Sequence, residues 1–67
     1  MGTILSQNGK FLVRPAYIEI HEGGYIFARV WGEDRGSVLL GKYNNLERAK
    51  GVLREIFQTE YYEMPIE

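Results

Sequence analysis

Side chains alternate between two faces along residues 17–21 and 25–31, as they do in β-strands. Glu22-Gly23-Gly24 separates these two runs and is typical of a turn. With three residues in the loop, Tyr17 pairs with Arg29 and His21 pairs with Tyr25. This register predicts a hairpin with one apolar face, because a slip of one residue would mix the two faces. The apolar face carries Ile18, Ile20, Ile26, Ala28 and Val30.

The opposite face of residues 25–31 is not polar. It presents three aromatic rings and a guanidinium, on Tyr25, Phe27, Arg29 and Trp31. A half-buried strand of a small domain is expected to turn polar side chains toward water. We therefore predict that this face is an intermolecular contact with another copy of the chain, another protein or a flat anionic ligand.

Shorter patterns predict three further strands. Residues 3–5 and 11–13 are expected to pair through Asn8-Gly9, because Asn-Gly is a strong hairpin signal, and Pro15 ends the second of these strands. Residues 37–43 alternate again and predict a fifth strand. Together with the central hairpin, these runs predict an antiparallel meander.

Residues 46–59 predict a helix, since Asn44-Asn45 supplies an N-cap and Glu47 lies favourably in the first turn. Residues 59–67 then form either a short edge strand or an arm. We expect one domain, residues 1–67, of the α+β class: about five short antiparallel strands covered on one face by one C-terminal helix, with a possible extra C-terminal edge strand. The apolar face of the helix carries Leu46, Ala49, Val52, Leu53, Ile56 and Phe57.

Composition limits the ways in which such a small domain can be stabilised. A chain of 67 residues buries only about 60% of the surface that it exposes when unfolded. Small domains compensate with disulfides, metals or oligomerisation, and this chain has no cysteine and one histidine, His21. We therefore expect a homo-oligomer, with no metal and no cofactor.

Charge and hydropathy limit the partners. Eight basic and nine acidic residues give a net charge of −1, whereas duplex DNA binders normally show a clear basic excess. The N-terminus lacks the basic start and long apolar run of a signal peptide, and no apolar run reaches membrane-spanning length. We expect neither a duplex DNA partner nor a membrane, and a reducing cytosol as the compartment.

The aromatic face is the leading candidate site. Aromatic rings stack on nucleobases and arginine pairs with phosphate, but oligomer interfaces prefer the same residue types. The two interpretations are compatible, because pockets often form where subunits meet. The candidate ligand-binding residues are Tyr25, Phe27, Arg29 and Trp31, with Tyr17 and Arg14 as weaker candidates.

Other polar groups predict no reaction. Histidine side chains can act as acids or bases near neutral pH, but no nucleophile partners His21, so we expect no catalytic residue and no enzyme. Glu33-Asp34 offers too few oxygen ligands for a divalent cation, and the glycines of Gly23-Gly24 and Gly32…Gly36 lead into no helix. The helix N-terminus beside Arg48 is a better anion site by geometry, although most such ends bind nothing.

Four segments are similar to a group of short, mostly uncharacterised accessory proteins of phages and prophages of Gram-positive bacteria. They are Ser6–Lys10, Leu39–Tyr43, Glu47–Leu53 and Tyr62–Pro65. The resemblance implies a phage protein made in the host bacterial cytoplasm, where many such proteins counter host defence. Some are oligomeric sponges that sequester nucleotide-derived immune signals, and others block a defence protein directly.

The resemblance and the aromatic face together predict a non-enzymatic binding protein. It would counteract host immunity by sequestering a nucleotide-derived signalling molecule in a pocket between subunits. The alternative is a protein inhibitor that docks on a host defence protein or nuclease through the aromatic face or the acidic tail. An enzyme that degrades such a signal through His21 ranks last, because a second acid–base group is missing.

Overall fold

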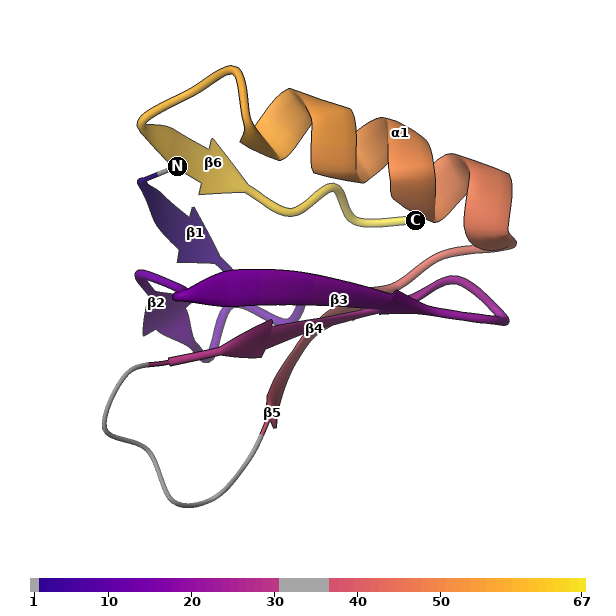
Figure 1. Cartoon of the computed structure of the whole chain (residues 1–67), viewed down its shortest axis with the longest axis horizontal. Helices are drawn as coiled ribbons and strands as arrows, with labels where there is room; N and C mark the ends of the chain where they lie inside the picture. The colour runs from indigo at the N-terminus through magenta and orange to yellow at the C-terminus, as the bar shows by residue number, and fades with distance from the viewer. Residues whose placement is uncertain (1, 31–36) are drawn as a thin grey trace.

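The computed structural model describes residues 2–30 and 37–67, which form seven elements. One helix and two three-stranded sheets make up this part of the chain, so the predicted α+β class with a single helix is confirmed (Figure 1). No helix of the described residues is both long and apolar enough to cross a membrane. The elements are β1 (Thr3–Leu5), β2 (Leu12–Val13), β3 (Tyr17–His21), β4 (Tyr25–Arg29), β5 (Ser37–Lys42), α1 (Leu46–Ile56) and β6 (Tyr61–Glu63).

The first sheet is the antiparallel meander β3–β4–β5. Tyr17 pairs with Arg29 and His21 pairs with Tyr25, so the register predicted from the three-residue loop is confirmed. Gly23 and Gly24 have φ angles of 89° and 88°, a backbone conformation that glycine adopts without strain. The apolar face of the hairpin therefore points into the core, where Ile26 and Ala28 are fully buried.

The pairing of β4 with β5 contains a β-bulge. Ile26 pairs with Gly41 and Phe27 pairs with Leu39, so Leu40 has no partner residue on β4. The successive residues Leu40 and Gly41 are therefore both buried on the core side, whereas Leu39 is 43% exposed on the other side. The bulge keeps both the apolar and the outward-facing rows of the sheet aligned across all three strands.

The second sheet has the order β2–β1–β6. β2 pairs with β1 antiparallel, as predicted from Asn8-Gly9, and β6 pairs with β1 in parallel. The C-terminal segment thus adds an edge strand rather than a detached arm. The five-strand meander predicted from the sequence divides into two sheets at the connection between β2 and β3 (Figure 1).

Helix α1 begins after Asn45, whose side chain accepts a hydrogen bond from the Arg48 backbone N–H at 2.9 Å. The helix ends at Ile56, three residues before the predicted end, and the expectation that Phe57 belongs to its buried face is wrong. Phe57 is the C-cap and is 60% exposed. The buried face of α1 consists of Ala49, Val52 and Ile56.

The core lies between α1 and the inward faces of both sheets. Buried side chains from α1 and from both sheets pack together in one continuous cluster. Met64, which follows β6, also belongs to the cluster and is only 4% exposed. The cluster comprises Ile4, Ile26, Ala28, Leu40, Tyr43, Ala49, Val52, Ile56 and Met64.

The C-terminal segment is fastened to this core by polar contacts. The backbone carbonyl of Pro65 accepts hydrogen bonds from the Gln7 amide at 3.0 Å and from the Tyr43 hydroxyl at 2.9 Å. The Gln7 amide oxygen also accepts from the Lys42 backbone N–H at 3.0 Å. Gln7 therefore connects the end of β1, the end of β5 and the C-terminal segment.

Burial and the Arg48–Glu67 hydrogen bond shift four pKa values around α1. Burial, reinforced by the negative charge of Glu67, raises the pKa of Tyr43 to about 12. Burial and a hydrogen bond to Glu55 raise the pKa of Tyr62. The Arg48 Nε donates to Glu67 at 2.7 Å, and this bond lowers the pKa of the Glu67 carboxyl and raises that of Arg48.

Candidate binding surface

The outward-facing residues of the β3–β4–β5 sheet form three rows across the strands, which we call the outer face. The pairing of β3, β4 and β5 places one residue of each strand in each row. No described helix or strand covers this side of the sheet, whereas α1 lies on the other side (Figure 1). The rows are His21–Tyr25–Lys42, Glu19–Phe27–Leu39 and Tyr17–Arg29–Ser37.

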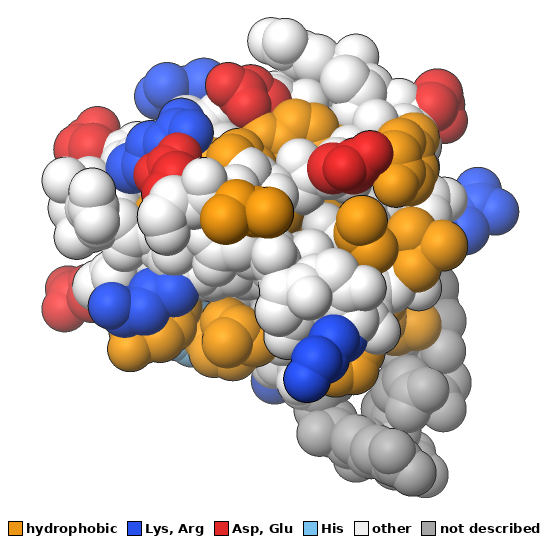
Figure 2. Space-filling model, turned by 180° about the vertical axis from the view of Figure 1, so that it is seen from behind, with side chains coloured by type: hydrophobic (Ala, Val, Ile, Leu, Met, Phe, Trp, Pro, Cys, Tyr) orange, Lys and Arg blue, Asp and Glu red, His pale blue; other side chains and the backbone are white. Residues whose placement is uncertain are grey.

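Large apolar groups of the outer face are open to solvent. Tyr17 is 51% exposed, Leu39 43% and Tyr25 36%, and Phe27 in the middle row is half-buried by its neighbours. Figure 2 shows hydrophobic side chains reaching the surface next to basic ones along the lower side of the molecule. Apolar residues scattered singly on a surface need no explanation, but contiguous rows mark an interaction site.

The rings of the outer face support one another. Tyr25 and Phe27 stack with centroids 6.3 Å apart and an interplanar angle of 20°. His21 meets the Phe27 ring edge-on at 5.0 Å, and the Lys42 ammonium lies 5.5 Å from the centroid of Tyr25. Pre-positioned, nearly parallel rings of this kind can stack on a flat ligand without large ordering costs.

Arg29 is already engaged within the chain. Its Nε lies 3.6 Å from the Glu19 carboxylate oxygen on β3 and is buried without a hydrogen-bond partner among the described residues. The same carboxylate oxygen lies 3.9 Å from Nε2 of His21. Glu19 thus partly neutralises the guanidinium that the sequence marks as the candidate phosphate ligand.

The structure brings together four of the six residues predicted to bind a ligand: Tyr17, Tyr25, Phe27 and Arg29 all belong to the outer face. Arg14 lies exposed in the connection between β2 and β3, outside the three rows. Trp31 lies outside the described residues.

Sequence reasoning did not name the three members of the outer face that β5 contributes: Ser37, Leu39 and Lys42. Strict alternation along residues 37–43 would place Lys42 on the same face as Leu40, but the bulge at Leu40 changes the phase and places Lys42 on the outer face. The Leu39-Leu40-Gly41 run was the available signal, since adjacent leucines beside a glycine are compatible with a bulge.

The remaining candidates for chemistry are the carboxylates, the glycine loops and the N-terminus of α1. The described residues contain no cluster of three or more His, Asp or Glu side chains that could hold a metal ion. At the N-terminus of α1, Arg48 pairs with Glu67 and lies over the Tyr43 ring at 5.9 Å. Glu33-Asp34 and Gly32…Gly36 lie outside the described part of the chain.

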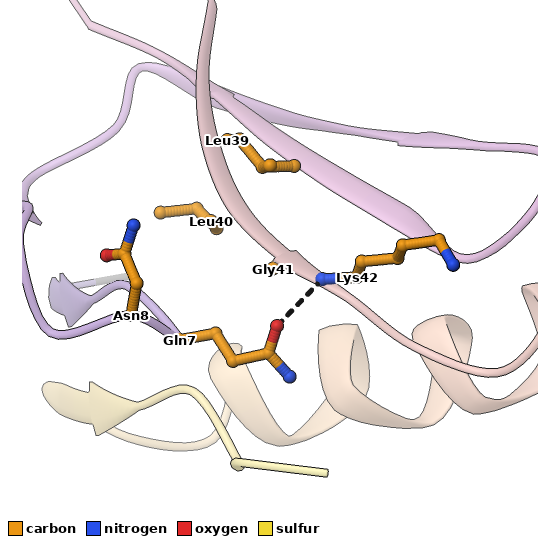
Figure 3. Close-up of a pocket in the computed structure, with 6 residues that line it drawn as sticks. All are labelled: Gln7, Asn8, Leu39, Leu40, Gly41 and Lys42. Atoms are coloured by element: carbon orange, nitrogen blue, oxygen red, sulfur yellow. Dashed lines mark hydrogen bonds between the residues drawn. The ribbon is translucent and has the colours of Figure 1, made fainter.

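A small pocket adjoins the outer face at the β5 bulge (Figure 3). Its volume is about 100 Å³, and its lining includes no acidic side chain. The Asn8 oxygen accepts hydrogen bonds from the Ser6 hydroxyl at 2.6 Å and the Lys10 backbone N–H at 2.9 Å, which leaves the Asn8 amide nitrogen turned toward β5 (Figure 3). The lining residues are Gln7, Asn8, Leu39, Leu40, Gly41 and Lys42.

The fold and this surface define an α+β protein with an aromatic sheet face that none of the described helices and strands covers. Comparisons of the chain with family models, curated proteins and solved structures gave no match.

Proposed function

We propose that this chain is a non-enzymatic binding protein that acts through its outer face. Two or more copies associate through this face and hold a nucleotide-like ligand between them. In the setting implied by the sequence resemblance, the protein works in the cytoplasm of a phage-infected bacterium and withdraws a nucleotide-derived signal of host immunity. The observation that carries the proposal is the exposed Tyr25–Phe27 ring pair with basic groups beside it.

The chemistry of the ring pair favours a flat, anionic ligand. Stacking of a nucleobase on an aromatic side chain is worth about 1–3 kcal/mol. The rings of Tyr25 and Phe27 lie between Lys42 at one end of β4 and Arg29 at the other, so a base and an attached phosphate both find partners on the same surface.

The size of the pocket favours enclosure by more than one copy. Sites that enclose small molecules have volumes of about 300–1,000 Å³, and the pocket at the β5 bulge has about 100 Å³. A single chain therefore offers a nucleotide a platform rather than a cavity at this position. A second outer face placed over the first would close the platform into an inter-subunit pocket.

A protein inhibitor is the second candidate, and the Glu19–Arg29 pair favours it. This pair reduces the net positive charge of the outer face, which suits a protein surface as well as a small anion. The acidic tail is a weaker contact for that role, because its segment 61–63 is built into a sheet and Glu67 is engaged by Arg48.

Retention of a small molecule tests the proposed function. The purified chain is incubated with a panel of cyclic dinucleotides and ADP-ribose, freed of unbound compound, and then denatured. We expect one compound to be retained in a fixed ratio and released chemically intact. A wild-type chain that retains none of them overturns the proposal, and a chemically altered product would establish an enzyme.

An experiment in infected cells distinguishes a nucleotide-binding protein from a protein inhibitor. Isolation of the tagged chain from infected cells, with a Phe27→Thr chain as control, should yield a small molecule and no stoichiometric host protein. One host protein recovered in a fixed ratio with the wild-type chain, and not with the control, would establish the inhibitor instead.

A further inference from the structure

We propose that Lys42, rather than Arg29, is the residue of the outer face that binds the anionic group of the ligand. This assignment rests on the proposed function and names the cation of the site. Lys42 lies at the end of β5, in the same row as Tyr25, and its ammonium is 5.5 Å from the centroid of the Tyr25 ring. The ammonium therefore lies over the ring on which a base would stack, and its flexible stem lets it meet the anionic group attached to that base.

The two cations of the outer face differ in their counterions. Arg29 has the Glu19 carboxylate at 3.6 Å, so a phosphate that approaches the guanidinium also meets a negative charge. Lys42 forms no ion pair with any carboxylate among residues 2–30 and 37–67. An incoming anion gains more from Lys42 because it need not displace or oppose a carboxylate there.

The surroundings of Lys42 also favour an anion. Lys42 lines the pocket at the β5 bulge, whose side chains are amides and leucines with no acid among them. The Asn8 amide nitrogen of this lining is turned toward β5, since its oxygen is occupied by Ser6 and Lys10 (Figure 3). The lining of this pocket therefore adds no negative charge that would oppose an anion bound at Lys42.

Hydrogen bonds hold the backbone at Lys42, whereas its four-carbon side chain is flexible. The Lys42 N–H donates to Gln7, and Gln7 is held in turn by Pro65. A lysine with its flexible stem acts as a point charge that follows a phosphate, which is how lysines serve in many phosphate sites. Replacement of the side chain leaves the Gln7 bond intact, because that bond uses only the backbone.

The test compares two probes and two matched variants. ADP-ribose carries the phosphates and adenosine lacks them, so their affinities separate the contribution of the anion from that of ring stacking. Isothermal titration of the wild-type chain, Lys42→Gln and Arg29→Gln gives both affinities for each protein. We expect Lys42→Gln to weaken ADP-ribose binding by about tenfold or more and to leave adenosine binding unchanged, because one charge-assisted contact is lost.

Arg29→Gln should weaken ADP-ribose binding by no more than roughly threefold, since Glu19 already neutralises part of its charge. Lys42→Arg should restore affinity, and the salt dependence of ADP-ribose binding should decrease only in Lys42→Gln. The assignment is overturned if the wild-type chain binds ADP-ribose and Lys42→Gln binds it equally well. A wild-type chain that binds neither probe overturns the proposed function for this ligand class, and the assignment with it.

Discussion

The two faces of the β3–β4–β5 sheet are made by the same three strands and meet opposite environments. On the inner face, Ile26 and Ala28 are fully buried, and the packing partner is α1. On the outer face, Tyr17, Tyr25 and Leu39 remain between 36% and 51% exposed. The inner face explains how the chain folds, and the outer face carries residues that its fold does not require.

The polar groups of the two sides differ in how completely they are hydrogen-bonded. On the core side, the Gln7 amide, the Tyr43 hydroxyl and the Pro65 carbonyl satisfy one another at 2.9–3.0 Å. On the outer face, the Nε of Arg29 is buried and has no hydrogen-bond acceptor within residues 2–30 and 37–67. Buried polar atoms are normally paired, so hydrogen bonding is complete for this core-side group and incomplete on the outer face.

The largest contrast should appear when one apolar side chain is truncated on each face. Ile26→Ala is expected to lower the free energy of unfolding by about 2–5 kcal/mol, because it leaves a cavity in a fully buried site. Phe27→Ala should lower it by about 1 kcal/mol or less, because the ring is half-exposed in one chain. Urea unfolding at the lowest practical protein concentration measures both, and equal losses would contradict the division between the two faces.

A smaller effect is expected from removal of single hydroxyls. Tyr43→Phe removes the bond to the Pro65 carbonyl and should lower the free energy of unfolding by about 0.5–1.5 kcal/mol, toward the lower limit because Gln7 still donates to the same carbonyl. Tyr17→Phe is the matched control, since its residue is 51% exposed on the outer face. Urea unfolding should show no change for the control, and a control that loses as much as Tyr43→Phe would refute the contrast.

The same tyrosine gives a dependence on alkaline pH. Burial raises the pKa of Tyr43 to about 12 in the folded chain, above its ordinary value of 10.0. A raised pKa stabilises the fold below the ordinary value, and this contribution is lost as the pH rises from about 10 to about 12. The stability advantage of wild type over Tyr43→Phe should therefore shrink over that range, and a constant difference would show that the phenol ionises normally.

The smallest effect concerns the exposed tail. The hydrogen bond from Arg48 lowers the pKa of Glu67, so its contribution is present above the ordinary glutamate pKa and is lost as the pH falls through the lowered value. Glu67→Gln should remove this dependence, whereas Glu63→Gln, on the exposed side of β6, should keep it. Amide exchange of residues 61–67 between pH 3 and pH 6, roughly the span of ordinary glutamate titration, measures the effect. Identical exchange of wild type and Glu67→Gln throughout this range would contradict it.

Local patterns predicted the central hairpin well, because its information lies within a few residues. The spacing of Ile18, Ile20, Ile26 and Ala28 and the three-residue turn allow only one register with an apolar face. The N-cap at Asn45 was equally local. Both predictions depend on neighbours in the sequence, which a single chain displays directly.

The division into two sheets was not predictable in the same way. β6 pairs in parallel with β1, from the opposite end of the chain, and no local pattern states that pairing. The phase change at Leu40 arises from a bulge that depends on how β5 meets β4 and the core together. For the candidate site, the aromatic side chains followed from alternation, while Lys42 and the Glu19–Arg29 pair required the three-dimensional register.

Association of the chain tests most directly the central claim that the outer face is an intermolecular surface. Sedimentation of the wild-type chain over a wide concentration range should show an oligomer, and Phe27→Thr should shift it to monomer while circular dichroism shows an unchanged fold. Threonine suits a strand and places a polar group at the centre of the three rows. A wild-type chain that stays monomeric at every concentration, or an oligomer unaffected by Phe27→Thr, would contradict the account.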